Sequence, residues 1–161
     1  MKDDLYASHL PILAKLVENT KENIVEFGMG FSTTLLHAMC KQTERKIFSY
    51  ENDRKWYEKF KGYECGWHEI NYVEDWDSIS TLRALNSLVF LDHRPAMRRR
   101  VDALRLKYTA NIIVLHDSEP EQDKFFGYKK IYPEFEYVYQ YTVCRPHTAV
   151  LSNFINLSFL T

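Results

Sequence analysis

The sequence has 161 residues, of which 45% are hydrophobic and 15% aromatic, and a formal net charge of −1. This length is typical of one domain with a full hydrophobic core, and the charge gives no basic field to attract nucleic acid or an anionic membrane. The three cysteines lack the number and spacing of a disulfide framework or a zinc knuckle. With neither a signal-peptide pattern nor an apolar run of about 20 residues, we expect one soluble, cytoplasmic domain over residues 1–161.

The apolar pattern predicts helices and strands in alternation. Residues 1–20 carry apolar side chains at helical spacing and are expected to form an amphipathic helix. Residues 21–117 then form the expected core, with strands at 23–27, 46–51, 69–73, 87–91 and 111–115. The helices expected between them start at 32 or 33 and cover 56–60, 78–85 and 96–107. Residues 118–161 hold a loop and two strand-like stretches, 135–143 and 148–154.

These elements predict the fold class. Strands that are apolar throughout and separated by helices are typical of a parallel sheet covered on both faces. The loop at 144–147 is too short for a parallel crossover, so the last two strands must be antiparallel. We therefore expect an α/β fold with a doubly wound, mostly parallel seven-stranded sheet, a C-terminal antiparallel hairpin and helices on both faces.

Acidic residues stand at or just beyond the carboxyl ends of the first five expected strands, where doubly wound sheets bind ligands. They are Glu26, Glu51, Asp75, Asp92 and Asp117. A carboxylate is costly to desolvate unless a cation or a hydrogen-bond donor compensates it. The ring of acids therefore favours a ligand with hydroxyls, amino groups and positive charge, such as S-adenosylmethionine, with a metal ion as the alternative.

Gly28 and Gly30 follow the first strand, and neither has a Cβ that would hinder a sharp turn or close approach to a ligand. Taken alone, this pair is also typical of an ordinary tight turn. Glu51 follows at about the 20-residue separation expected of a ribose-binding acid. Its alternative interpretation is a solvated acid that caps a helix.

These segments together resemble the class I, Rossmann-like methyltransferases that depend on S-adenosylmethionine. Residues 25–33 resemble motif I in its E-x-G-x-G-x-S-T form, and residues 49–53, 88–93 and 113–117 are similar to the second-, fourth- and fifth-strand motifs. The resemblance spans about residues 20 to 155. Two departures stand out: Ser32 replaces the third glycine, and a His-Arg-Pro sequence follows Asp92.

The resemblance implies S-adenosylmethionine as cofactor and a role for each matching residue. Gly28 and Gly30 would face its methionine part, Glu51 its ribose hydroxyls and Asp92 its sulfonium. The other residues that the resemblance assigns to cofactor binding are Glu26, Ser32, Thr33, Asp75 beside the adenine amine, and Trp76 stacked on the adenine ring.

Histidines adjoin two of the acids, which makes His93, His116, Asp92 and Asp117 the candidate catalytic residues. An imidazole with a pKa near 6.5 can act as a general base toward an acceptor; the alternative is a structural histidine. Asp92, His116 and Asp117 could instead hold a divalent cation, as in catechol-type O-methyltransferases. Those enzymes place an amide where this chain has Ser118, so no metal site is assigned.

The sequence thus predicts methyl transfer from S-adenosylmethionine to an unidentified acceptor, most simply a small molecule. The alternatives are a non-catalytic module that binds S-adenosylmethionine and an NAD-type dinucleotide-binding protein, although Thr33 occupies the place of that fingerprint's third glycine. The arginine cluster at 94–100 is either a solvated helix face or a clamp for a carboxylate or phosphate. No membrane partner is expected, and self-association is left open.

Overall fold

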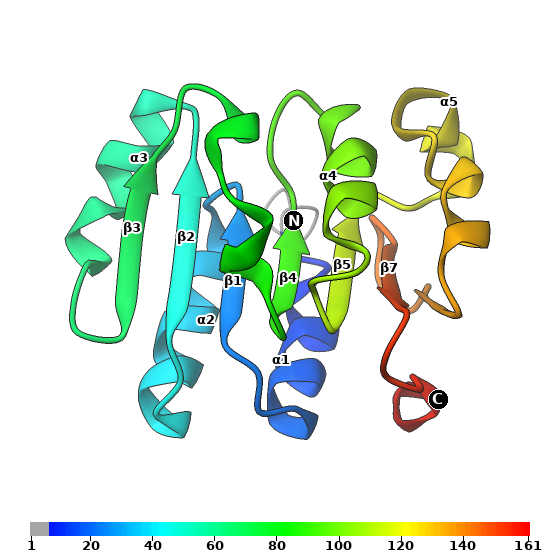
Figure 1. Cartoon of the computed structure of the whole chain (residues 1–161), viewed down its shortest axis with the longest axis horizontal. Helices are drawn as coiled ribbons and strands as arrows, with labels where there is room; N and C mark the ends of the chain where they lie inside the picture. The colour runs from blue at the N-terminus through cyan, green and yellow to red at the C-terminus, as the bar shows by residue number, and fades with distance from the viewer. Residues whose placement is uncertain (1–6) are drawn as a thin grey trace.

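The computed structural model describes residues 7–161, which form a seven-stranded sheet between two layers of helices (Figure 1). The strands are β1 (Ile24–Phe27), β2 (Ile47–Glu51), β3 (His68–Tyr72), β4 (Leu88–Leu91), β5 (Ile112–His116), β6 (Tyr137–Tyr141) and β7 (Thr148–Ser152). The α-helices are α1 (Leu10–Asn19), α2 (Phe31–Thr43), α3 (Arg54–Phe60), α4 (Arg98–Leu106) and α5 (Asp123–Phe126).

The strand order is β3-β2-β1-β4-β5-β7-β6. Strands β1 to β5 pair in parallel, and β7 pairs antiparallel with both β5 and β6. The predicted α/β class, the mostly parallel sheet and the antiparallel C-terminal hairpin are therefore confirmed. The insertion of β7 between β5 and β6 is decided by long-range pairing, which the local sequence pattern did not predict.

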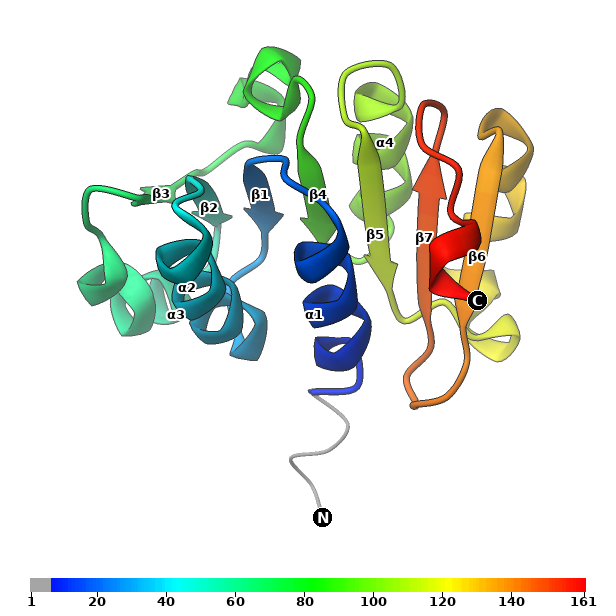
Figure 2. The same ribbon diagram turned by 90° about the horizontal axis from the view of Figure 1, so that it is seen from below.

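The sheet is apolar on both faces because successive side chains of a strand point to opposite sides. Val25, Phe27, Val89 and Leu91 point to a core shared with α4, whereas Ile24, Leu88 and Phe90 point to a second core. That second core is shared with α1 and α2, which contribute buried leucines to it. Figure 2 shows α1, α2 and α3 on one side of the sheet and α4 on the other.

Two predicted helices have different bounds. The helix expected at 1–20 is observed as α1, which begins at Leu10 with a proline in its first turn, where a missing N–H is harmless; residues 1–6 lie outside the described part. The helix expected at 78–85 is replaced by two 3-10 turns, Trp76–Ser78 and Thr81–Ala84. Ser80 separates them because its side chain accepts from the N–H of Leu82 and starts a new turn.

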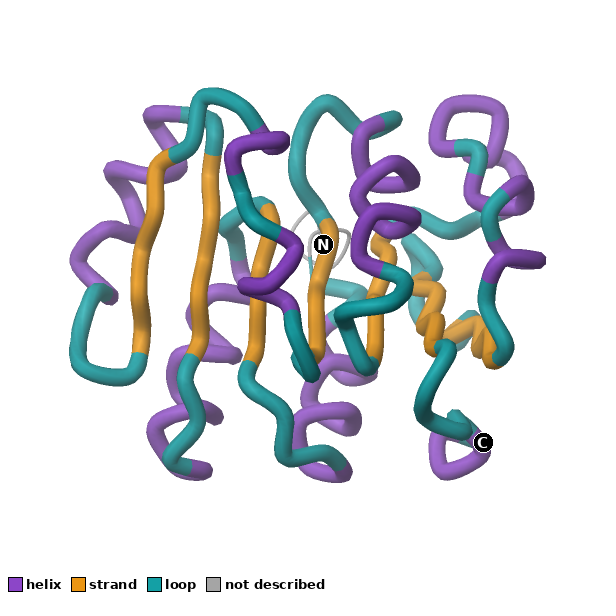
Figure 3. Tube along the Cα trace, viewed as in Figure 1, coloured by secondary structure: helices purple, strands orange, loops and turns teal. Residues whose placement is uncertain are grey.

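Parallel pairing places the carboxyl ends of β1 to β5 along one edge of the sheet, and the orange strands of Figure 3 run between the helical layers toward it. Loops leaving this edge carry most of the predicted site residues. Within residues 7–161, no helix has the length and apolar character needed to cross a bilayer.

Candidate functional site

The glycine loop connects β1 to α2 and gives its two glycines different surroundings. Gly28 has φ +91°, and a Cβ built there would lie 2.7 Å from backbone atoms of Asp92 and His93. Gly28 is thus required by the close packing of two loops. Gly30 has extended backbone, and a Cβ there would have no atom within 4 Å beyond its chain neighbours. Of the two glycines in this loop, Gly30 is therefore the one with open surroundings.

Glu26 lies inside the protein, under α2. Its side chain accepts hydrogen bonds from Ser32 Oγ at 2.6 Å, Thr33 Oγ1 at 3.0 Å and Ser49 Oγ at 2.6 Å. Burial raises the pKa of Glu26 to about 7, although these three hydroxyls favour the ionised form. The prediction that Glu26, Ser32 and Thr33 reach a ligand is corrected: their polar atoms are bound to one another and fix the junction between β1 and α2.

Glu51, the last residue of β2, is turned toward the glycine loop. Its Oε2 accepts from the N–H of Met29 at 2.7 Å, and its Oε1 accepts from the N–H groups of Asn52 and Asp53. Burial raises the pKa of Glu51, against the opposing effect of these backbone donors. A carboxylate oxygen can accept two hydrogen bonds, so Oε2 retains capacity for one more donor, although the residue is only 5% exposed.

Asp75 and Trp76 follow β3 and have opposite environments. Asp75 is exposed and accepts from the N–H of Asp77. Trp76 is 4% exposed, and its ring stacks on Phe27 with 5.3 Å between centroids. The Trp76 indole N–H donates to the carbonyl of Arg94 at 2.8 Å. Trp76 therefore belongs to the core, and the predicted stacking on an adenine ring is wrong for this arrangement.

Asp92 stands at the end of β4 and meets two residues from neighbouring elements. Arg99 Nη2 lies 2.8 Å from Asp92 Oδ1, and His116 Nδ1 lies 3.3 Å from the same oxygen. Burial alone would raise the pKa of Asp92, but the hydrogen bond with His116 and the charge of Arg99 hold it at about 2. Burial would lower the pKa of His116, but its hydrogen bond with Asp92 raises it instead.

Asp117 is joined to the same cluster through Arg99. Arg99 Nη1 lies 2.7 Å from Asp117 Oδ2, so one guanidinium bridges the acids that follow β4 and β5. The side chains of Asp92 and Asp117 are 27% and 25% exposed, whereas that of Arg99 is 7% exposed. The structure thus brings the predicted residues Asp92, His116 and Asp117 together at the carboxyl edge of the sheet.

His93 does not join this cluster, because its side chain points into the core shared with α4. Its Nε2 pairs with Asp102 Oδ2 at 2.9 Å, and both side chains are fully buried. Burial lowers the pKa of His93, although the neighbouring Asp102 carboxylate opposes this shift. The assignment of His93 as a catalytic base is corrected, because no acceptor can reach a side chain with no exposed surface.

The arginine cluster is divided between structural and exposed positions. Arg98 pairs with Asp102 one turn further along α4 and with Asp77 of the 3-10 turn Trp76–Ser78. Arg99 bridges Asp92 and Asp117. Arg94 is exposed, and Arg100 packs against Gly127. Neither interpretation from the sequence describes Arg98 or Arg99, because both form ion pairs with the fold's own carboxylates.

Sequence reasoning missed two residues that precede α1. Ser8 Oγ lies 3.0 Å from His116 Nε2, and the His9 ring lies 4.5 Å from the His116 ring, edge to face. Burial and the neighbouring His116 lower the pKa of His9 to about 3, so the ring is neutral. The available signal was the Ser-His pair directly before an amphipathic helix, whose N-terminus had to meet the carboxyl edge of the sheet.

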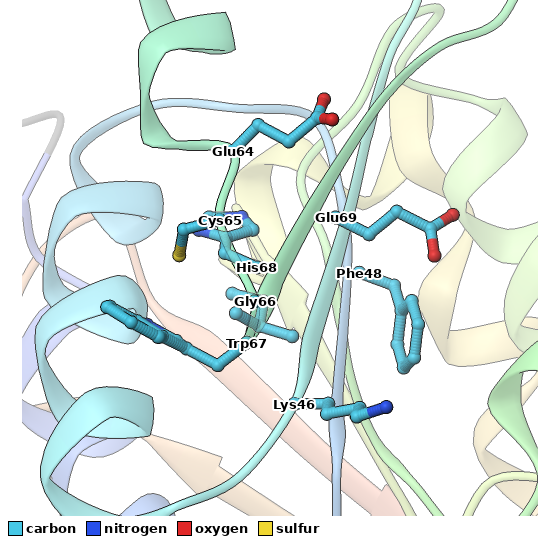
Figure 4. A pocket seen from close by; sticks show the side chains of 9 residues that line it. Lys46, Phe48, Glu64, Cys65, Gly66, Trp67, His68 and Glu69 are labelled. Carbon is cyan, nitrogen blue, oxygen red and sulfur yellow. The ribbon is translucent and has the colours of Figure 1, made fainter.

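A hollow lies at the opposite edge, near the amino ends of β2 and β3 (Figure 4). Its lining includes Lys46, Cys65, Trp67 and His68, and none of the predicted site residues. In this region His68 Nε2 contacts Ser49 Oγ at 2.9 Å, and His68 Nδ1 contacts His37 Nδ1 at 3.0 Å. The buried carboxylate of Glu26 is therefore linked through Ser49 and His68 toward this edge.

Comparison with known proteins gives a likeness of fold. No protein-family model and no curated protein matches this sequence. Among solved structures, the METTL16 methyltransferase domain has a TM-score of 0.68 at 12% identity, with 94% of this chain and 68% of that chain covered. Cofactor-bound Rv0187 from MTB has a TM-score of 0.62 at 17% identity, covering 89% of this chain and 79% of that one.

A third similar structure is Sp1610 of Streptococcus pneumoniae, a candidate tRNA (m1A22) methyltransferase in complex with S-adenosyl-L-methionine. Its TM-score is 0.61 at 9% identity, with 93% of this chain and 74% of that chain covered. Identities this low report on architecture alone. The comparisons therefore show that about nine-tenths of this chain adopts the α/β fold found in methyltransferases that use S-adenosylmethionine.

Proposed function

We propose that this protein binds S-adenosylmethionine at the carboxyl edge of its sheet and transfers the methyl group to an acceptor. The observation that carries the proposal is the antiparallel β7 between β5 and β6. The dinucleotide-binding Rossmann fold has the order 3-2-1-4-5-6 with parallel strands. The observed order matches the methyltransferase likeness and weighs against the NAD-type alternative.

The local geometry supports a cofactor position beside Gly30. Met29, the residue before Gly30, donates its N–H to Glu51 Oε2, and in this proposal the same oxygen also accepts from a ribose hydroxyl. Asp92, ionised and partly exposed at the end of β4, would lie beside the sulfonium, and exposed Asp75 would accept from the adenine amine. In-line methyl transfer depends mainly on holding donor and acceptor in line and close together. In this proposal the partly exposed Asp117 faces the acceptor, and His116, which is 4% exposed and bonded to Ser8 and Asp92, orients Asp92.

The acceptor class has to be found by experiment. The comparisons give no support to the small-molecule acceptor expected from the sequence, and Sp1610 carries a tRNA methyltransferase description. The proposal is therefore methyl transfer without a committed acceptor. Incubation with methyl-labelled cofactor and two acceptor pools, total tRNA and small metabolites, would show where label appears; no label in either pool, with binding intact, would favour a non-catalytic module.

Cofactor binding is tested with a variant that leaves the fold unchanged. Gly30 has extended backbone, and a Cβ built there meets no atom within 4 Å, so Gly30→Val places its side chain in the proposed ligand space without a strained φ. Calorimetry with S-adenosylhomocysteine should show an affinity at least tenfold weaker, about 1.4 kcal/mol.

The matched control is Gly66→Val, since Gly66 also has open surroundings but lies at the opposite edge. It should bind S-adenosylhomocysteine like the unmodified protein. Equal binding by both variants, or quenching by NADH without any S-adenosylhomocysteine binding, would contradict the proposal.

A further inference from the structure

Within the described part of the chain, His9 is a buried imidazole whose two ring nitrogens make no hydrogen bond. Its exposed fraction is 2%, and among residues 7–161 neither ring nitrogen has a hydrogen-bond partner. The ring stacks on Phe90 at 4.8 Å between centroids. A buried polar group without a partner costs about 1 to 3 kcal/mol, and such groups are uncommon in native proteins. A ligand for His9 would remove this cost.

Two further side chains that can bind a metal ion, Asp92 and His116, lie close to His9. Ligand atoms of His9, Asp92 and His116 all lie within 4.8 Å of one another, and Asp92 Oδ1 is 3.3 Å from His116 Nδ1. A transition-metal ion with bonds of about 2.0 to 2.2 Å separates its ligand atoms by roughly 3 to 4.3 Å. Small side-chain rotations therefore suffice to place all three atoms around one ion.

A hydrogen bond with Ser8 holds the His116 ring in an orientation suited to metal binding. Ser8 Oγ lies 3.0 Å from His116 Nε2 and can accept its N–H. His116 Nδ1 donates to Asp92 Oδ1 at 3.3 Å in the metal-free protein, and an ion bound there would take the place of that proton while Ser8 holds the N–H of Nε2. Histidines that bind metals commonly donate their second ring N–H in this way, which fixes ring orientation and tautomer.

The local charge also suits a cation. The carboxylates of Asp92 and Asp117 share the single guanidinium of Arg99, so one negative charge is in excess once His116 has released the proton that metal binding displaces. Asp117 is held by Arg99 at 2.7 Å, so the ligand set differs from the Asp92, His116 and Asp117 set considered from the sequence. Asp92 is partly exposed and gives an ion a route from solvent.

We propose that His9, Asp92 and His116 form a binding site for a divalent first-row transition-metal ion. Two imidazoles and one carboxylate favour Zn²⁺, Fe²⁺ or Co²⁺ over Mg²⁺ and Ca²⁺, which prefer ligand sets made of oxygen. Three protein ligands leave coordination positions open for water or substrate. Asp92 is shared with the proposed cofactor position, so a bound ion and the sulfonium would compete for the same carboxylate.

The site is tested on the full chain after chelation and dialysis, without S-adenosylmethionine. Zn²⁺ calorimetry and the visible absorption of a Co²⁺ titration should each give one ion per chain, and Mg²⁺ should not compete. His9→Gln and Asp92→Asn should each weaken Zn²⁺ binding by at least about 100-fold, and Ser8→Ala by about tenfold through its effect on His116.

His37→Gln is the matched control, because His37 belongs to the other close histidine pair, with His68. It should leave Zn²⁺ affinity unchanged. Loss of binding in His37→Gln but not in His9→Gln, or no stoichiometric binding at all, would overturn the proposal. If His9→Gln fails to fold, Asp92→Asn and the Co²⁺ spectrum still decide. Metal binding is measured without cofactor, so its failure is distinguishable from failure of the proposed methyl transfer.

Discussion

His93 Nε2 lies 2.9 Å from Asp102 Oδ2, and neither side chain has exposed surface. The same carboxylate accepts from Arg98 Nε at 2.9 Å and from Arg105 Nη1 at 2.5 Å. Asp102 therefore joins the β4 loop, where His93 lies, to two turns of α4. This network positions the loop that presents Asp92 to the candidate site.

Asp102→Ala should destabilise the protein strongly. The substitution leaves His93, Arg98 and Arg105 without their shared buried acceptor, and loss of one partner from a buried ion pair costs about 3 to 5 kcal/mol. Urea denaturation measures the loss. Asp77→Ala is the control, because Asp77 pairs with Arg98 from a side chain that is 62% exposed; solvent screens such a pair, so this variant should lose far less stability than Asp102→Ala. Similar losses for both variants would contradict the proposed importance of Asp102.

The two glycines of the β1–α2 loop should respond differently to alanine. Gly28→Ala forces a Cβ to within 2.7 Å of backbone atoms at a φ of +91°, which we expect to cost about 2 to 4 kcal/mol. Gly30→Ala meets no atom and should change stability by less than about 1 kcal/mol. Thermal and urea unfolding of the two variants provide the comparison. A stable Gly28→Ala protein would show that the two loops do not pack this closely.

Trp76→Phe should leave affinity for S-adenosylhomocysteine within about twofold. The Trp76 ring packs on Phe27, and its N–H is bound to the Arg94 carbonyl, so no face of the ring is free to stack on adenine. The expected effect is on stability, about 1 to 3 kcal/mol for the lost buried hydrogen bond and contacts. Calorimetry and urea unfolding separate the two effects, and a tenfold loss of affinity at unchanged stability would restore the stacking role.

Glu26 should make stability fall as pH rises. Its pKa is about 7 in the folded protein and 4.5 in the reference state, so the folded state favours the protonated form. The stability that this proton supplies is complete below pH 4.5 and is lost as the pH rises through 7. Between pH 5 and pH 8 the loss is about 2 to 3 kcal/mol.

Glu26→Gln removes this titration. Its free energy of unfolding should therefore change less between pH 5 and pH 8 than that of the unmodified protein, and the difference isolates Glu26 from every other titrating group. Urea titrations at the two pH values measure it. Parallel pH dependence in both proteins would mean that Glu26 is ionised in the fold throughout this range.

The alternation of side-chain direction along β1 and β4 is enough to predict that Glu26 and His93 are buried. Val25 and Phe27 point to the core shared with α4, so Glu26 between them has to point to the opposite face, under α2. His93 follows Leu91 by two residues and continues its direction into the same core. Counting side-chain direction along β1 and β4 would have placed both residues inside the protein.

The sequence by itself determined the class of fold, because each strand's apolar pattern, the short loop at 144–147 and the glycine turn are local properties. It also identified Glu51, Asp92, His116 and Asp117 at strand ends, since parallel strands bring such positions to one edge. Only the tertiary structure decided which of these side chains are free to contact a ligand and which are bound to other residues. Arg99 from α4 binds Asp92 and Asp117, and Ser8 and His9 reach His116 from more than 100 positions earlier in the chain. Such contacts depend on how distant elements pack, which no local pattern specifies.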